Sequence, residues 1–314
     1  ISVSGVPVKV KNFEWKTIFN WSKNNSMVES LPEGIDKIQI GSGVYNVKSY
    51  AEVGKPYGAI YAKTFKRDAE GYILCQLDGS PKEGQDYEYL GCVQADWRGG
   101  WNNVFRLGNF SFSVMFDFQK GGKFFSQTSI QSSVDGQSVK SLEGRDADFF
   151  SRKILGESDE ERYGFMRPQN ANTPTANGQI YPDWGRPKGV VLPNCRYDED
   201  VEGLAGQQVL GYCTPERYWM HYTSRDISRF IYDASYVKLR EITVSYDLPK
   251  KWLRKTPFQT FRVAAVGRNI ATLFANTPHG LDPQATSTTG NAQGFERGFN
   301  LPSATYGFDI KVSF

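Results

Sequence analysis

Apolar and polar residues alternate along several segments of this chain, with the period of two that is typical of a β-strand with two different faces. Residues 303–314 show the pattern most clearly, because apolar side chains stand at every second position. The same alternation occurs at 12–22 and 109–120, where most apolar positions are aromatic. The residues expected on the apolar face are Phe13, Trp15, Phe19, Trp21, Phe110, Phe112, Phe116, Phe118, Tyr306, Phe308, Ile310 and Val312.

In the segment 233–248 the alternation slips by one residue. One extra residue near Arg240 and Glu241 accounts for the slip, because a β-bulge places two residues opposite one. We therefore predict a β-bulge at this point. The apolar positions before and after it are Val237, Leu239, Ile242, Val244, Tyr246 and Leu248.

The connections between the alternating segments are short and long in turn. The long ones cover residues 23–93, 128–232 and 272–302. Transmembrane β-barrels place short turns on the periplasmic side and long loops outside. The pattern therefore predicts an all-β chain of antiparallel strands with long external loops and a periplasmic C-terminus. The expected strands are 1–10, 12–22, 94–106, 109–120, 233–248, 258–271 and 303–314.

Alternation alone also fits a soluble β-sandwich, because a sandwich strand has one apolar inward face. Large aromatic residues and strands of about nine to twelve residues favour a transmembrane barrel. Single-chain bacterial barrels have even strand numbers, and each unpaired edge group costs several kcal/mol in lipid. An odd number of strands therefore predicts that residues 1–314 form the C-terminal part of a larger barrel. A passive porin or adhesion barrel is a second interpretation, and a soluble secreted glycan-binding sandwich is a third.

Composition narrows the class of protein. Aromatic residues make up 14% of the chain and charged residues 23%. No run approaches the roughly eighteen apolar residues that a spanning helix needs. The net charge of +3 is too small to indicate nucleic-acid binding. We therefore expect neither a helical membrane protein nor a nucleic-acid partner.

The residues that usually carry catalysis or hold a metal are few. The four cysteines lack CxxC spacing and the two histidines lie far apart, so we expect no enzyme activity, metal or cofactor. The run 196–203 resembles the start of an EF-hand loop, but Val209 stands where the bidentate glutamate is required. A solvated acidic turn is the favoured interpretation. Cys195 and Cys213 lie in one external loop, where a disulfide or two thiols fit equally well.

Binding residues are expected in the long connections, because loops on a rigid scaffold carry function. The connection 128–232 exceeds ordinary loop lengths several-fold and is rich in Tyr and Trp. Aromatic faces stack on sugar rings, so Trp184, Tyr218 and Trp219 are the candidates for substrate contact. The alternative is that these side chains form a core of the loop itself or pack on a partner protein.

Several longer motifs follow one another along nearly the whole chain. The first is VGKPYGAIYAKTFKRDAEG at 53–71, and the last is LPSATYGFDIKVSF at 301–314. Between them lie QADWRGGWNNVFRLGNFSFSVMFDFQKGGKFF, DASYVKLREITVSYDLPKKWL and GRNIATLFANTPHGLDPQ. Together these motifs resemble the SusC/RagA family of TonB-dependent outer-membrane transporters.

The resemblance implies a fold, a function and partners. Complete members of the family are similar to a 22-stranded barrel with an N-terminal plug, a TonB box and a SusD-like surface lipoprotein. No segment of this chain resembles the plug or the TonB box, so residues 1–314 are expected to supply about the last third of the barrel wall. The implied function is import of oligosaccharides or peptides across the bacterial outer membrane, with TonB acting through the missing part. Phe314 resembles the terminal signal read by the barrel-assembly machinery, and outer-membrane lipid is the implied surrounding of the wall.

Overall fold

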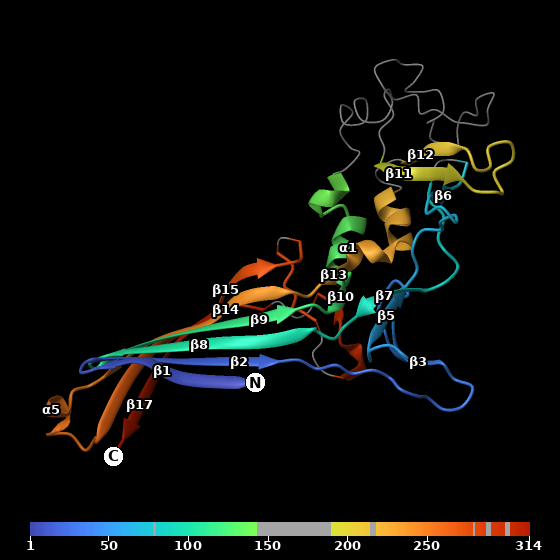
Figure 1. The fold of residues 1–314 in the computed structure, drawn as a ribbon. Helices are drawn as coiled ribbons and strands as arrows, with labels where there is room; N and C mark the ends of the chain where they lie inside the picture. Colours follow the sequence, from blue (N-terminus) through green and yellow to red (C-terminus); the bar gives the residue numbers. More distant parts are fainter. Residues whose placement is uncertain (78–79, 143–189, 214–217, 279, 287–289, 299–301) are drawn as a thin grey trace.

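The computed structural model describes residues 1–77, 80–142, 190–213, 218–278, 280–286, 290–298 and 302–314. Its main element is a seven-stranded sheet with the strand order β1-β2-β8-β9-β14-β15-β17, drawn in Figure 1 as a long, curved wall. Among the described residues, no helix is both long and apolar enough to cross a membrane. The strands of the wall are β1 (Ser2–Val10), β2 (Phe13–Ser22), β8 (Trp97–Leu107), β9 (Phe110–Lys120), β14 (Tyr236–Asp247), β15 (Thr260–Ala275) and β17 (Thr305–Ser313).

Each of these strands is one that the sequence predicts, so the predicted all-β sheet is confirmed. Neighbouring strands pair antiparallel throughout the sheet. The extents differ mainly where strands meet the long connections: β8 begins at Trp97 instead of 94, and β15 ends at Ala275 instead of 271. At the other end, short turns join β1 to β2 and β8 to β9, and a longer turn containing α5 (Lys250–Leu253) joins β14 to β15.

The β-bulge predicted near Arg240 is confirmed. Both ladders of β14 shift register between Leu239 and Glu241, and Arg240 has no partner in either described ladder. A second register shift surrounds Pro7 in the edge strand β1. Proline cannot donate a ladder hydrogen bond, so an edge strand with a bulge is a place where it fits.

Antiparallel partners lie on the same face of a sheet, so the pairings define its two faces. One row of partners crosses all seven strands: Val8, Trp15, Phe105, Phe112, Val244, Ala265 and Phe308. The adjacent row, on the opposite face, is Lys9, Glu14, Arg106, Ser111, Ser245, Ala264 and Asp309. The register places every aromatic and aliphatic residue selected from the three alternating segments on the first face. The sheet therefore has one apolar face and one polar face.

The apolar face is open. Phe112 is 40% exposed, Phe110 57% and Phe308 84%. A sandwich would bury these rings between two packed sheets. The interpretation as a soluble sandwich is therefore wrong.

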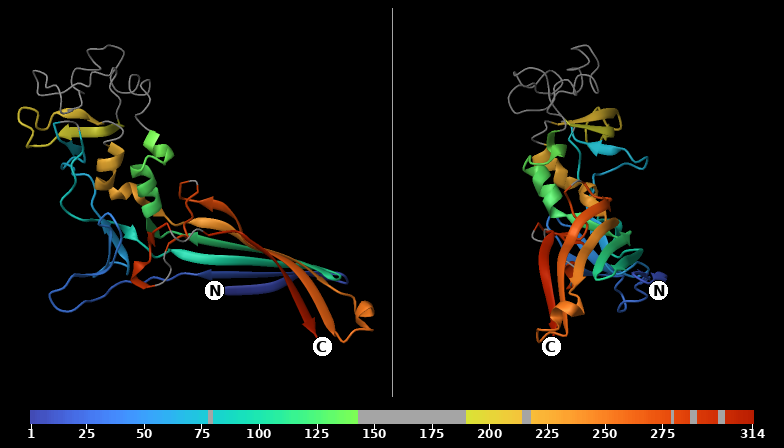
Figure 2. Two further views of the ribbon diagram at one scale, coloured as in Figure 1. Left: turned by 180° about the vertical axis from the view of Figure 1, so that it is seen from behind. Right: turned by 90° about the vertical axis from the view of Figure 1, so that its left-hand side faces the viewer.

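The long connections fold into a second body, here called the loop domain, which comprises the described parts of 23–96, 121–235 and 276–304. Both views of Figure 2 show it gathered at one end of the wall. Three small sheets have the strand orders β3-β4-β5-β7, β13-β10-β16 and β12-β11-β6. Their strands are β3 (Lys37–Ser42), β4 (Lys48–Glu52), β5 (Ala59–Ala62), β6 (Ile73–Cys75), β7 (Glu88–Cys92), β10 (Lys123–Ser126), β11 (Val190–Tyr197), β12 (Gln208–Cys213), β13 (Ile231–Asp233) and β16 (Phe295–Glu296). Its helices are α1 (Gln127–Val134), η1 (Val139–Leu142), η2 (Tyr218–Tyr222), η3 (Thr223–Arg225), η4 (Ile227–Phe230) and η5 (Gly290–Ala292).

A hydrophobic core lies in the loop domain rather than in the wall, and all three long connections contribute to it. Glu296 joins the third connection to the second at the start of α1: its carboxylate accepts hydrogen bonds from Ser126 Oγ at 2.6 Å and Thr128 Oγ1 at 2.7 Å. Ser126 also caps α1, because its side chain accepts a bond from the Ser129 amide. The core residues are Val47, Ile60, Ala62, Phe125, Ile130, Ile227, Phe230 and Phe295. The connections, which the sequence predicts as long external loops, therefore form a packed domain.

Candidate functional site

The polar face of the wall meets the loop domain at the ends of β8, β9 and β14. Arg98, Gln119 and Tyr236 are partners in the same row of this face. One register step closer to the centre of the sheet, Asp117 of β9 pairs with Lys238 of β14. These side chains therefore converge where the inside of the wall opens toward the loops.

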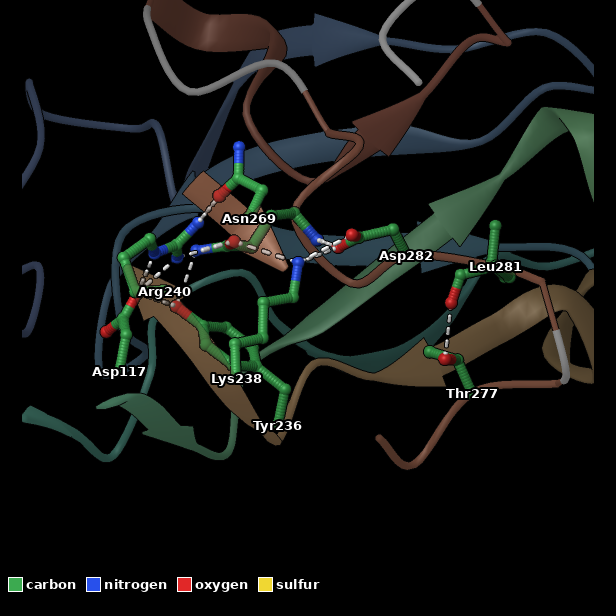
Figure 3. A network of polar contacts seen from close by, with 9 residues as sticks. Asp117, Tyr236, Lys238, Arg240, Asn269, Thr277, Leu281 and Asp282 are labelled. Atoms are coloured by element: carbon green, nitrogen blue, oxygen red, sulfur yellow. Dashed lines mark hydrogen bonds and ion pairs between the residues drawn. The ribbon is translucent and has the colours of Figure 1, made fainter. Parts of the chain in front are cut away.

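A network of charged and amide groups fills this junction (Figure 3). Arg240 donates from Nε to Asp117 Oδ2 at 3.1 Å, from Nη1 to Asn269 Oδ1 at 2.6 Å and from Nη2 to Gln284 Oε1 at 2.8 Å. Lys238 Nζ donates to both oxygens of Asp282 at 2.5 Å and to Gln284 Oε1 at 3.0 Å. Each charge thus has an opposite charge or an amide oxygen beside it.

The network attaches the third connection to the wall. The Lys238 side chain is buried, and the Asp282 side chain is only 20% exposed. Gln284 adds a bond from Nε2 to the Tyr236 hydroxyl at 2.5 Å, and its backbone amide donates to Asp282 Oδ1 at 2.8 Å. Residues from Asp282 to Gln284 are therefore fixed against β14 by charge-assisted hydrogen bonds, which are stronger than neutral ones.

Two clefts adjoin this network. One has a volume of about 350 Å³ and is lined by Arg98, Asp117, Lys123, Tyr236 and Gln284 among others. The other, of about 310 Å³, shares Arg98, Val93 and Gln293 with the first. Arg98 is exposed, and its guanidinium forms no hydrogen bond or ion pair with any residue that the structure describes. The junction therefore offers a cation together with amide and hydroxyl groups to a polar ligand.

A third cleft, of about 520 Å³, lies on the loop-domain side and is lined by Met27, Tyr89, Lys123 and Asp233 among others. Burial alone would raise the pKa of Asp233, but hydrogen bonds from Ser235 and Asn276 and the charge of Lys123 lower it to about 2. Lys123 Nζ lies 3.4 Å from the Asp233 carboxylate. Asp233 is therefore ionised at neutral pH.

Trp219, one of the three loop aromatics predicted to contact substrate, lies in η2 of the loop domain. Trp219 is only 1% exposed, and the Arg229 guanidinium lies 5.5 Å from the centre of its ring. Its ring packs within the loop, as in the alternative interpretation, and contact of Trp219 with a substrate stays a prediction. Trp184 and the side chain of Tyr218 lie outside the described residues.

In the acidic turn after Cys195, Asp198 is buried and held by lysines, whereas Glu199, Asp200 and Glu202 are exposed as expected. Asp198 accepts hydrogen bonds from Lys66 and Lys82, both at 2.8 Å, and Lys82 also reaches Asp200. These contacts join the first long connection to the second. In the described residues, no group of three or more His, Cys, Asp or Glu side chains could hold a metal.

The pairing of β11 with β12 bears on the disulfide left open by the sequence. Cys195 lies opposite Val209, whereas Cys213 lies opposite Val190. Four residues of extended strand span about 13 Å, and a disulfide requires Cα atoms within about 7 Å. A bridge between Cys195 and Cys213 would need another register. The side chain of Cys213 lies outside the described residues.

Comparison with known proteins supports the architecture. No protein-family model matches the chain. The TonB-dependent receptor P3 of Formosa agariphila is 22% identical over 327 residues, which cover 97% of this chain and 26% of that protein. Solved structures of the RagAB peptide importer in the closed-closed state (TM-score 0.56, 15% identity) and of the RagAB peptide transporter (TM-score 0.54, 16% identity) match 100% of this chain.

The chain has the fold of part of a TonB-dependent barrel transporter. RagA is a SusC-like protein, so the resemblance to the SusC/RagA family is confirmed in the fold. The chain spans about a quarter of its curated relative and 28–29% of the solved chains. The relatives are receptors and transporters rather than enzymes.

The residues of the junction were not among the candidates that the sequence suggested. The sequence did contain a signal for them, because Asp117, Lys238 and Arg240 are charged residues within strands that are expected to cross a membrane. Alternation could place Asp117 and Lys238 on the polar face. Only the folded chain shows that Asp282 and Gln284, from a connection far along the sequence, complete the site.

Proposed function

We propose that this chain forms part of the wall of an outer-membrane nutrient importer of the TonB-dependent type. The apolar row that crosses all seven strands, with Phe308 84% exposed, is the observation that carries the proposal. A face of this kind is unfavourable in water and suits hydrocarbon, whereas the opposite row of charged and small residues suits a water-filled lumen. The complete barrel supplies further strands beside β1 and β17.

The arrangement of connections supports an orientation. The short turns and α5 lie at one end of the wall and the loop domain at the other (Figure 1). Barrels of this class have short periplasmic turns and long external loops. The loop domain is therefore external, and the C-terminus, next to the turn-side end of β17, is periplasmic. Phe314 stands in the position of a terminal assembly signal.

The junction supports the proposed cargo, and the resemblance to the SusC/RagA family supports the proposed partners. The clefts beside Arg98 offer donors and acceptors that suit the hydroxyls of an oligosaccharide or the amides of a peptide. The solved relatives are structures of a peptide importer, which supports a peptide as one of the two cargo classes. A SusD-like lipoprotein over the loop domain is the proposed partner on the outside. Coupling to TonB belongs to the part of the protein beyond this chain.

Spin labelling of the complete barrel in lipid vesicles tests the two-faced wall. Labels at Phe308→Cys and Asp309→Cys lie on opposite faces at nearly the same depth. We expect the label at position 308 to collide with oxygen dissolved in lipid and the label at position 309 to collide with a water-soluble nickel chelate. The unsubstituted protein gives the background of labelling. Equal access of the chelate to both positions would reject a wall in lipid.

Uptake measurements test import itself. Cells that carry the complete protein receive labelled oligosaccharides and labelled peptides, with and without functional TonB. We expect accumulation of one class that stops when TonB is removed. Uptake that continues without TonB would identify a passive porin instead, and no uptake of either class would reject both cargo assignments.

A further inference from the structure

The turn between β14 and β15 carries a cluster of cations at the end of the wall opposite the loop domain. Lys250, Lys251, Arg254 and Lys255 are all exposed. None of them forms an ion pair with any residue in the described ranges. Two basic residues nearby do have acidic partners, since Arg262 binds Asp247 at 2.6 Å and Lys9 binds Glu14 at 3.3 Å. The turn therefore carries four positive charges close together, without acidic partners among the described residues.

The backbone holds these cations in place. The Trp252 amide donates to the Pro249 carbonyl at 2.8 Å, and the Thr256 amide donates to the Leu253 carbonyl at 2.9 Å. Leu253 is 7% exposed, so the turn has a buried residue of its own. The Leu248 amide also donates to the Phe261 carbonyl of β15 at 2.8 Å. An ordered turn loses less entropy when it binds a partner than a flexible one does.

Aromatic rings surround the same end of the wall. Trp252 is 64% exposed and Phe314 73%. The ring of Phe258 lies 5.2 Å from that of Phe314, and Phe110 lies 4.6 Å from Tyr246, centre to centre. Trp and Tyr prefer the boundary between hydrocarbon and headgroups in membrane proteins. The rings place this boundary next to the cationic turn.

We infer that α5 and the residues up to Lys255 bind the anionic headgroups of phospholipids in the periplasmic leaflet, with Trp252 at the headgroup level. Exposed cations beside a membrane attract anionic lipid, roughly fivefold in affinity for each Lys or Arg near the surface. An acidic protein partner would explain the charge but not the exposed aromatic rings beside it. This inference rests on the proposed function, because the wall must stand in a membrane.

Tryptophan quenching by brominated lipids tests the inference. The complete barrel is reconstituted in phosphatidylethanolamine vesicles that contain either brominated phosphatidylglycerol or brominated phosphatidylcholine at equal mole fractions. Subtracting the spectrum of the Trp252→Phe variant isolates the signal of Trp252. We expect brominated phosphatidylglycerol to quench this signal more strongly, and added salt to reduce the difference because it screens exposed charges.

Paired substitutions identify the cause. In Lys250→Gln/Lys251→Gln and in Arg254→Gln/Lys255→Gln, we expect the preference for phosphatidylglycerol to fall by about fivefold for each cation removed. Lys23→Gln/Lys120→Gln is the matched control, because both lysines are exposed at the loop end of the wall. We expect the control to keep the preference of the unsubstituted protein.

The other outcomes separate the inference from the proposed function. Equal quenching by the two lipids would overturn the headgroup preference. Quenching of Trp15 and Trp21 without quenching of Trp252 would leave the wall in the membrane but remove α5 from its surface, in favour of a protein partner. Failure of every tryptophan to respond would reject the membrane wall, and the inference with it.

Discussion

Arg240 donates a hydrogen bond from Nε to Oδ2 of Asp117 over 3.1 Å, and this contact joins the bulge of β14 to the neighbouring strand β9. Because of the bulge, Arg240 and Glu241 follow each other on the polar side, between the apolar positions Leu239 and Ile242. The bulge therefore keeps the apolar face continuous although β14 has one extra residue, and that residue adds a cation to the network on the polar face.

Deletion of Arg240 should cost about as much as its substitution. Without the extra residue, Leu239 and Glu241 become neighbours, and their pairs with Phe116 and Met115 continue one regular ladder. Both parts of β14 then keep their apolar side chains on the same face, so we expect the deletion to form the folded barrel. Arg240→Ala keeps the bulge, and both variants should lose about 1–3 kcal/mol of unfolding free energy through lost hydrogen bonds.

Heat-modifiable migration in gels and urea unfolding of the complete barrel measure the two effects. Failure of the deletion to fold while Arg240→Ala folds would show that the register of β14 depends on the bulge. The substitution serves as the control for loss of the side chain.

Alternation was sufficient to predict the wall, because each of its strands has one apolar and one polar face. The slip at Arg240 could be located for the same reason. The loop domain could not be predicted in this way. Its core joins Phe125, Ile227 and Phe295, which lie far apart in the sequence, and its strands are too short to show a period. The burial of Trp219 could not be predicted either, because the sequence cannot tell an exposed aromatic loop residue from a buried one.

Lys238→Met should release the third connection from the wall. Lys238 is 4% exposed, and its removal leaves the Asp282 carboxylate without its cation. Breaking a buried ion pair on one side costs about 3 kcal/mol even at the lower end of the usual range. We expect faster amide hydrogen exchange around Leu281 and Gln284.

Lys16→Met is the matched control for this substitution. Lys16 lies on the polar face of β2 and is exposed, and no ion pair connects it to the described residues. It should leave exchange in the third connection unchanged. Equal exchange in the two variants would contradict a role of Lys238 in holding that connection.

The contact of Asp198 with Lys66 and Lys82 should make the loop domain sensitive to acid. Burial would raise the pKa of Asp198, but the hydrogen bonds from both lysines outweigh it and lower the pKa from 3.8 to about 2. A carboxylate with a lowered pKa stabilises the fold above its unfolded pKa, and this stability is lost as the pH falls. We expect a loss of about 2 kcal/mol between about pH 4 and pH 2.

Hydrogen exchange of β6 and β11, which pair beside Asp198, measures this loss. Asp198→Asn should be less protected above pH 4 and should lack the change below it. Glu199→Gln alters an exposed neighbouring carboxyl group and should keep the acid response. An acid response that persists in Asp198→Asn would assign it to other groups.

A charge on the apolar face should cost more than the same charge one residue away. Phe112 is 40% exposed on the apolar face, and Ser111 lies on the polar face beside Arg106. An arginine on the lipid side of a barrel costs about 2–4 kcal/mol near the midplane and less toward the interfaces. Because Phe112 lies near the turn end of β9, we expect Phe112→Arg to lose about 2 kcal/mol of unfolding free energy and Ser111→Arg to lose much less.

Urea unfolding of the complete barrel in lipid vesicles distinguishes the two variants. In water without lipid or detergent, we expect no such difference in stability between the two variants. In lipid, a larger loss for Ser111→Arg than for Phe112→Arg would mean that the polar face, not the apolar one, meets the membrane.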